Sequence, residues 1–120
     1  MATVNVTTSE FENLILKGGT TFVDFWASWC GPCIMFAPIF EKASERYPEL
    51  IFAKVDTDVE TQLAASAGIT SIPTLMAFRE GILVFRQPGA MPAASFEELI
   101  HAVKDLDMQS VKAEISKTRN

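Results

Sequence analysis

Apolar residues in the first hundred positions fall into short runs that alternate with amphipathic stretches. Residues 3–6 alternate polar and apolar side chains, which is typical of a short strand. Apolar runs at residues 21–26 and 50–55 predict two further strands. Two more runs, at residues 74–78 and 82–85, flank a glycine-containing turn and predict an antiparallel hairpin.

Helical patterns fill the gaps between these strands and follow the last one. The predicted helices occupy the stretch that ends at Gly18 and residues 34–47, 61–67 and 95–106. Capping-box residues begin the first and the last of them. Pro38 interrupts the second helix and should kink it, because proline lacks the N–H of a helical hydrogen bond.

The predicted element order is therefore β-α-β-α-β-α-β-β-α. Strands joined through helices favour parallel pairing, whereas the hairpin is antiparallel. We expect an α/β fold, a three-layer α/β/α sandwich around a central, mixed five-stranded sheet. The run at residues 21–26 is apolar on both faces apart from Asp24, so it is the predicted central strand.

The end of the chain differs in composition. Residues 108–120 are polar and keep only Val111 and Ile115 as branched apolar residues. We therefore expect one domain over residues 1–107 and a polar extension over residues 108–120. The extension either prolongs the last helix or is a loosely held tail, and two apolar anchors favour the tail.

The only two cysteines of the chain stand in the sequence Trp29-Cys30-Gly31-Pro32-Cys33, where the central strand meets the second helix. Residues i and i+3 are neighbours on a helix, close enough for a disulfide. The free N–H groups of the first turn and the helix dipole would stabilise a thiolate at Cys30. Pro32 suits this turn, and Gly31 leaves room beside the sulfurs for another chain. Dithiol redox chemistry is the leading interpretation.

Asp24 is the exception in the apolar central strand. A carboxylate buried there is costly to ionise, so its pKa should rise. The functional interpretation is an acid or base just below the dithiol. The alternative is a strand residue whose side chain reaches solvent near the edge of the sheet.

Other chemistries fit the two cysteines less well. A zinc site needs about four ligands, and the chain offers one cysteine pair and one distant histidine, His101. Two core cysteines brought together by chance would leave the Gly-Pro insert unexplained. A Cys-His hydrolase is poorly supported, because His101 lies in the last predicted helix, where a solvated residue is expected.

Composition narrows the function further. The net charge of −5 argues against binding nucleic acid. No stretch approaches 18 uninterrupted apolar residues, so no membrane span is expected. The N-terminus lacks the basic and apolar regions of a secretory signal, which favours a cytoplasmic location. In that compartment a cysteine pair is more often catalytic than structural.

The chain resembles the thioredoxin family over residues 4–106, and the resemblance implies the thioredoxin fold. It rests on the run from Val23 to Cys33 and on Ala53–Asp56, Ser71–Thr74 and Gly89-Ala90. Matched by position, Cys30 is the attacking nucleophile and Cys33 the resolving thiol. Asp24 corresponds to the buried family aspartate that assists proton transfer at Cys33, and Lys54 corresponds to the lysine near that aspartate.

The resemblance also implies a docking site for substrate. A cis peptide bond before Pro73 would leave the Ile72 backbone free to pair with an extended substrate segment. The expected apolar rim around Cys30 consists of Trp29, Ile72, Gly89 and Ala90. Family members often carry a basic residue directly after the second cysteine, whereas this chain has Ile34 and then Met35. Partner preference is therefore where we expect this chain to differ from its family.

The activity implied is reduction of protein disulfides by dithiol–disulfide exchange, with the Cys30–Cys33 disulfide as redox group and no cofactor. Disulfide-containing proteins would be substrates, an NADPH-dependent thioredoxin reductase would supply electrons, and the protein would act as a monomer. An oxidase or isomerase of the same fold more often has a histidine between the cysteines and a signal peptide. The non-enzymatic alternative is a redox-independent scaffold that binds a partner protein through the apolar rim.

Overall fold

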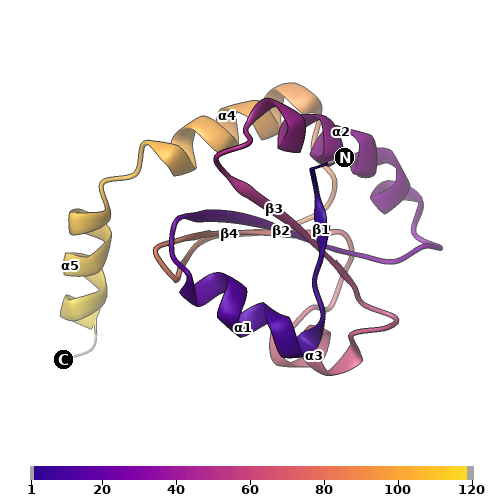
Figure 1. The fold of residues 1–120 in the computed structure, drawn as a ribbon, viewed down its shortest axis with the longest axis horizontal. Coiled ribbons are helices and arrows are strands. Elements are labelled where there is room, and N and C mark those ends of the chain that lie inside the picture. Colours follow the sequence, from indigo (N-terminus) through magenta and orange to yellow (C-terminus); the bar gives the residue numbers. More distant parts are fainter. Residues whose placement is uncertain (1, 119–120) are drawn as a thin grey trace.

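In the computed structural model, which describes residues 2–118, five strands form one sheet in the order β1-β3-β2-β4-β5. The strands are β1 (Val4–Asn5), β2 (Thr20–Trp26), β3 (Ile51–Asp56), β4 (Thr74–Arg79) and β5 (Ile82–Pro88). The helices are α1 (Thr8–Leu16), α2 (Gly31–Arg46), α3 (Thr61–Ser66), α4 (Ala93–Lys104) and α5 (Met108–Thr118). In Figure 1, α2 and α4 cover one face of the sheet, and α1 and α3 cover the other.

The sheet is mixed, as the sequence predicts, and β2 is its central strand. β3 pairs in parallel with both β1 and β2, and β4 pairs with β5 as an antiparallel hairpin. The hairpin turns at Glu80 and Gly81, which both have positive φ angles, 53° and 81°. The antiparallel pairing of β2 with β4 was not predicted, because element order alone does not place a hairpin beside a particular strand.

Two hydrophobic clusters lie on opposite faces of β2, because successive strand residues point to opposite sides. Phe22 packs under α2 and α4, whereas Val23 and Phe25 pack toward α1 and α3. The first cluster contains five buried rings that join β2, β3, α2 and α4: Phe22, Phe36, Phe40, Phe52 and Phe96. Burying such large rings is the main force that fixes α2 on the sheet. This packing sets the position of the cysteines at the start of α2.

The helix ends agree in part with the predicted caps. At the start of α1, the Thr7 N–H donates to Glu10 Oε1 over 3.1 Å, which confirms that capping box. The capping box predicted at Ser95 is wrong, because α4 already begins at Ala93 with Pro92 as its N-cap. Proline suits a helix start, since its missing N–H would have no helical partner there. α2 continues through Pro38.

The C-terminal extension differs from the loosely held tail that we expected. Residues 108–118 form α5, a separate helix that neither prolongs α4 nor lacks structure. Asp107 caps it by accepting the Gln109 N–H over 3.1 Å, and Met108 is buried. The expectation counted branched apolar residues and so missed this methionine. The boundary at residue 107 stays a prediction, and residues 1 and 119–120 lie outside the described part.

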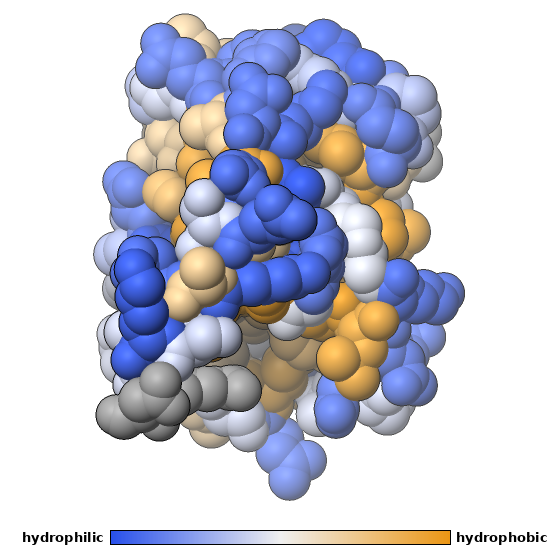
Figure 2. Space-filling view, turned by 90° about the vertical axis from the view of Figure 1, so that its left-hand side faces the viewer, coloured by the Kyte–Doolittle hydropathy of each residue, from blue (hydrophilic) through white to orange (hydrophobic). Residues whose placement is uncertain are grey.

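α5 lies at one end of the molecule, beyond the turn between β4 and β5 (Figure 1). Lys112 Nζ donates to Glu80 Oε1 over 2.6 Å, which links the helix to that turn. Figure 2 looks onto this end, where hydrophilic side chains cover most of the surface and apolar ones show between them. α5 therefore lies beside the β4–β5 hairpin at the edge of the sheet.

Candidate active site

The cysteine pair lies at the start of α2, as the sequence predicts. Cys30 is the N-cap residue and is joined to Cys33 by a disulfide, with 5.2 Å between their Cα atoms. The Cys33 N–H points at Cys30 Sγ over 3.2 Å. Gly31 and Pro32 form the first turn between the two cysteines. A helix N-terminus concentrates unpaired N–H donors and positive partial charge, so this position favours a negatively charged sulfur.

The loop before β4 lies against Cys30. The peptide bond between Ile72 and Pro73 is cis, which confirms the prediction. Cys30 Sγ lies 3.6 Å from the Ile72 carbonyl oxygen. The Pro73 carbonyl accepts the Gly89 N–H over 2.7 Å, so the loop is tied to the turn that carries Gly89 and Ala90. Segments that are far apart in sequence thus meet around one sulfur atom.

Asp24 is 1% exposed, so the alternative that its side chain reaches solvent is wrong. Both carboxylate oxygens are buried, and neither has a hydrogen-bond partner among residues 2–118. Burial disfavours the charged carboxylate and raises the pKa of Asp24 to about 7, while the positive charge of Lys54 opposes this rise. Lys54 stands directly opposite Asp24 on β3.

Trp26 is a further member of the site that the sequence analysis missed. It lies two residues after Asp24, on the same face of β2. Lys54 Nζ lies 4.8 Å from the centre of the Trp26 ring, which is a cation–π contact. The indole Nε1 of Trp26 is buried and has no partner in the described residues. The period-2 spacing of Asp24 and Trp26 places both side chains on one face of β2, and this spacing is the signal that could have added Trp26 to the site.

The rim around Cys30 is apolar and largely exposed. Trp29 is 70% exposed, and its Nε1 donates to Asp58 Oδ2 over 2.9 Å, which orients the indole. The sequence analysis placed Asp58 only in a polar turn. Ile72 is half-buried, and Ala90 is exposed. The two residues after Cys33 add to this surface, since Ile34 is 61% and Met35 73% exposed.

Features outside this region do not extend the site. His101 is exposed on α4 beside Tyr47 and Glu97, as expected for a solvated helix residue. Over residues 2–118, histidine, cysteine and acidic side chains form no group of three or more suited to a metal ion. Within the same range, the helices are too short or too polar to cross a membrane.

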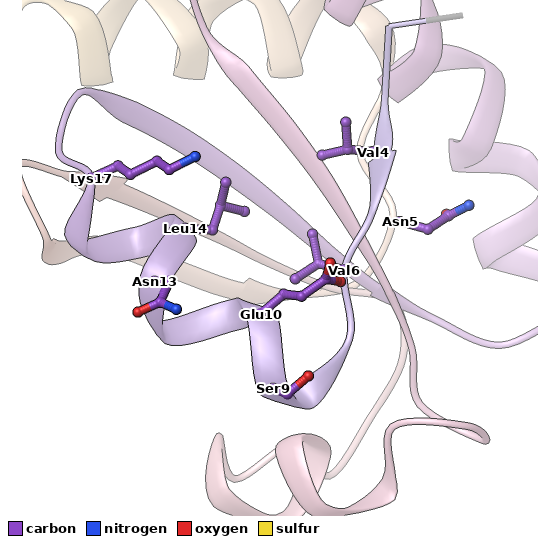
Figure 3. A pocket seen from close by; sticks show the side chains of 8 residues that line it. All are labelled: Val4, Asn5, Val6, Ser9, Glu10, Asn13, Leu14 and Lys17. Carbon is purple, nitrogen blue, oxygen red and sulfur yellow. The ribbon is translucent and has the colours of Figure 1, made fainter.

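A hollow of about 470 Å³ lies between β1 and α1 (Figure 3). Residues of both elements line it: Val4, Asn5, Val6, Ser9, Glu10, Asn13, Leu14 and Lys17. No residue predicted for the active site is among them. The hollow is therefore separate from the cysteine pair.

The match to the thioredoxin family model covers residues 2–102. The chain belongs to the thioredoxin family. It is 44% identical over 115 residues to the putative thioredoxin 2 of Streptomyces coelicolor, which covers 96% of this chain and 86% of that protein. It is also 44% identical over 94 residues to thioredoxin-1 of Saccharomyces cerevisiae, over 78% of this chain and 91% of that protein.

Solved thioredoxin structures have the same fold. Thioredoxin from Plasmodium falciparum superposes with a TM-score of 0.76 at 33% identity, over 83% of this chain and 97% of that one. Oxidised mitochondrial thioredoxin 3 from Saccharomyces cerevisiae gives 0.75 at 33% identity, over 87% and 95% of the two chains. The predicted thioredoxin fold is thereby confirmed.

Membership of the family, together with the cysteine pair, makes this chain a protein-disulfide oxidoreductase that works by dithiol–disulfide exchange. Proteins of the thioredoxin family use the active-site disulfide itself as the redox group. The family also implies disulfide-containing substrates and a reductase that returns the pair to the dithiol. The scaffold alternative gains no support from these relatives.

Proposed function

We propose that this thioredoxin-family protein reduces protein disulfides with Cys30 as the nucleophile and Cys33 as the resolving thiol. The observation that carries the assignment is the position of Cys30. It caps α2, its sulfur faces the Cys33 N–H, and it lies beside the Ile72 carbonyl. Both cysteines are buried in the disulfide form, Cys30 at 4% and Cys33 at 2% exposed, so the choice between them rests on the N-cap position of Cys30 and not on burial.

The exchange takes two steps. The Cys30 thiolate attacks one sulfur of the substrate disulfide, which forms a mixed disulfide and releases the other substrate sulfur as a thiolate. The Cys33 thiolate then attacks Cys30 Sγ. This forms the Cys30–Cys33 disulfide and releases the second substrate thiolate, so the substrate gains the two electrons that the dithiol loses.

Asp24 is proposed to take the proton from the Cys33 thiol during the second step and to return it in the reverse reaction. A pKa of about 7 suits this role, because a general base works best when its pKa is near the working pH. Lys54 is proposed to moderate the pKa of Asp24 through its charge. Gly31 and Pro32 are proposed to set the geometry of the turn between the cysteines.

The substrate is proposed to dock as an extended segment. The Ile72 backbone next to the cis bond is proposed to form strand-like hydrogen bonds with that segment. Trp29, Pro73, Gly89 and Ala90 would contact the segment on either side of its disulfide. The proposed electron donor is a flavin- and NADPH-dependent thioredoxin reductase, which would use the same rim.

We further propose that the protein works in the cytoplasm as a monomer. Both of its cysteines belong to the active site, so the fold does not rely on other disulfides. A reductase of this kind acts where thiols are kept reduced.

The test is NADPH-driven reduction of insulin disulfides with a thioredoxin reductase. Cys30→Ser should abolish turnover, because the attacking thiolate is gone. Cys33→Ser should instead accumulate a mixed disulfide through Cys30, visible by mass spectrometry without reducing agent. Full activity in Cys30→Ser would contradict the proposed roles.

A further inference from the structure

An uncharged groove opens next to the apolar rim. It has a volume of about 380 Å³ and lies between α2 and the loop that leads into α4. The residues that line it are Met35, Phe36, Ile39, Ala90, Met91 and Pro92. The side chains of this set carry no charge, although the chain as a whole has a net charge of −5.

The groove borders the loop that is hydrogen-bonded to the cis-proline segment beside Cys30. Ala90 belongs both to the rim and to the groove. Its neighbour Gly89 is hydrogen-bonded to Pro73, and the carbonyl of Ile72 lies beside Cys30. A substrate segment that pairs with Ile72 and continues past Gly89 therefore reaches the groove without leaving the surface.

The side chains that line the groove favour an apolar occupant over a charged one. Met35 is 73% exposed at one wall, and Met91 is half-buried at the other. Thioether side chains are flexible and polarisable, so they adapt to apolar groups of different shapes. A charged side chain placed there would lose its hydration without gaining a partner. An apolar side chain would instead remove apolar surface from water.

We propose that this groove is a specificity subsite that takes one apolar side chain, such as leucine, from the substrate segment flanking the disulfide. The inference rests on the proposed function, in which substrate docks at Ile72 and is attacked by Cys30. The subsite adds a sequence preference to the proposed activity. Disulfides followed or preceded by an apolar residue within reach of the groove are reduced faster than those with a polar residue there.

The kinetic test uses short peptides with one cysteine, activated as a mixed disulfide with thionitrobenzoate, whose release is coloured. One leucine is moved through successive positions on both sides of the cysteine, against an all-serine reference. With NADPH and a thioredoxin reductase as the source of electrons, kcat/KM at one position should exceed the reference by about tenfold, the range expected for burying an aliphatic side chain.

Met35→Gln should reduce this leucine preference to about twofold, because an amide replaces an apolar wall of the groove. Leu16→Gln is the matched control. Leu16 is 66% exposed, at the end of α1, outside the groove. Its substitution should leave the preference at the wild-type value.

A structural test follows the methionine methyl groups by NMR in Cys33→Ser, trapped as the mixed disulfide with the preferred peptide. The signals of Met35 and Met91 should shift relative to the complex with the serine peptide. Met76 and Met108 are buried elsewhere and should not shift, so they serve as internal references.

Two results would overturn the subsite: no leucine position that exceeds the reference, or a preference that Met35→Gln leaves unchanged. Both would leave the proposed function intact, provided that the wild-type protein still reduces insulin disulfides. Reduction of the same peptides by Cys30→Ser would instead contradict the proposed function. The two failures are therefore distinguishable.

Discussion

Polar side chains at the two ends of the molecule differ in their hydrogen bonding. At the active-site end, the carboxylate of Asp24 and the indole N–H of Trp26 are buried without hydrogen-bond partners in the described residues. At the other end, Arg79 binds the last carbonyl groups of α4, and Lys112 pairs with Glu80. Figure 1 has the β2–α2 junction at its right-hand end and α5 at its left-hand end.

The two ends therefore differ in role: the active-site end holds the groups that react, and the α5 end holds groups that stabilise the fold. A buried polar group without a partner costs free energy, and such groups often mark functional sites. The hydrogen-bonded end contributes stability without taking part in the reaction. We therefore expect substitutions at the active-site end to alter activity, in one case with a gain in stability. Substitutions at the α5 end should alter stability alone.

Asp24→Asn tests the contrast most strongly. Because the pKa of Asp24 is raised from 3.8 to about 7, the unfolded chain releases this proton at lower pH than the folded protein. Asp24 therefore costs no stability below pH 3.8, and its cost grows up to pH 7 and is constant above. A shift of this size corresponds to about 4 kcal/mol.

Asp24→Asn should thus raise the free energy of unfolding of the oxidised protein by about 2 to 4 kcal/mol at pH 8 and by little at pH 4. Urea unfolding at both pH values measures this difference. The same substitution should slow the release of substrate from the mixed disulfide in single-turnover experiments. A variant with unchanged resolution kinetics would remove Asp24 from the proton transfer.

Arg79→Met is the corresponding test at the other end. Arg79 Nη1 donates to the carbonyl oxygens of Val103 and Lys104 over 2.7 and 3.0 Å, and its side chain is only 17% exposed. Losing these charged hydrogen bonds should lower stability by about 2 kcal/mol, with insulin reduction unchanged. Arg86→Met is the control, because Arg86 also binds helix-end carbonyl groups but is exposed, and it should cost less.

Met108→Ala should change stability alone, and Met35→Ala should change substrate preference alone. Met108 is 7% exposed at the start of α5, and its truncation should cost about 1 to 2 kcal/mol, measured by thermal unfolding. Peptide preference should stay at the wild-type value. Met35 is 73% exposed, so its truncation should hardly change stability while it lowers the preference for leucine peptides. If both variants changed the same property, the separation of the two ends would be wrong.

Lys112→Met should have the smallest effect. The Lys112–Glu80 pair spans 2.6 Å, but both side chains are well exposed. Exposed ion pairs contribute little, since water and salt screen them. We expect a change in thermal midpoint within the error of the measurement. A clear loss would show that this ion pair, rather than the burial of Met108, attaches α5.

Local patterns predicted most of the fold and the centre of the site. The period of apolar residues located the strands, and the residues at positions 7–10 located the start of α1. The Cys-Gly-Pro-Cys insert located the disulfide, and an apolar strand with one aspartate located the carboxyl group with the raised pKa. Each of these features depends on residues that are close in the sequence, or on the burial of a strand whose residues are almost all apolar.

Contacts between distant segments were harder to predict. The Trp26–Lys54 contact and the Trp29–Asp58 hydrogen bond each join side chains from different elements. Sequence patterns fix which face a side chain occupies but not its distance from a partner. The structured α5 was missed for a similar reason, because its first anchor is an unbranched methionine whose burial depends on the surface against which it packs.

The sequence by itself determined the redox chemistry of this protein, because two cysteines at a helix start can pair without help from the rest of the chain. It also determined the alternation of elements and hence the α/β class. Only the tertiary structure decided where β4 joins the sheet and that an apolar groove lies between α2 and the loop at Ala90. It also decided that the carboxylate oxygens of Asp24 have no hydrogen-bond partner among residues 2–118. These properties depend on how α2, α4 and the loops pack, because this packing excludes water from Asp24 and leaves the groove open to it.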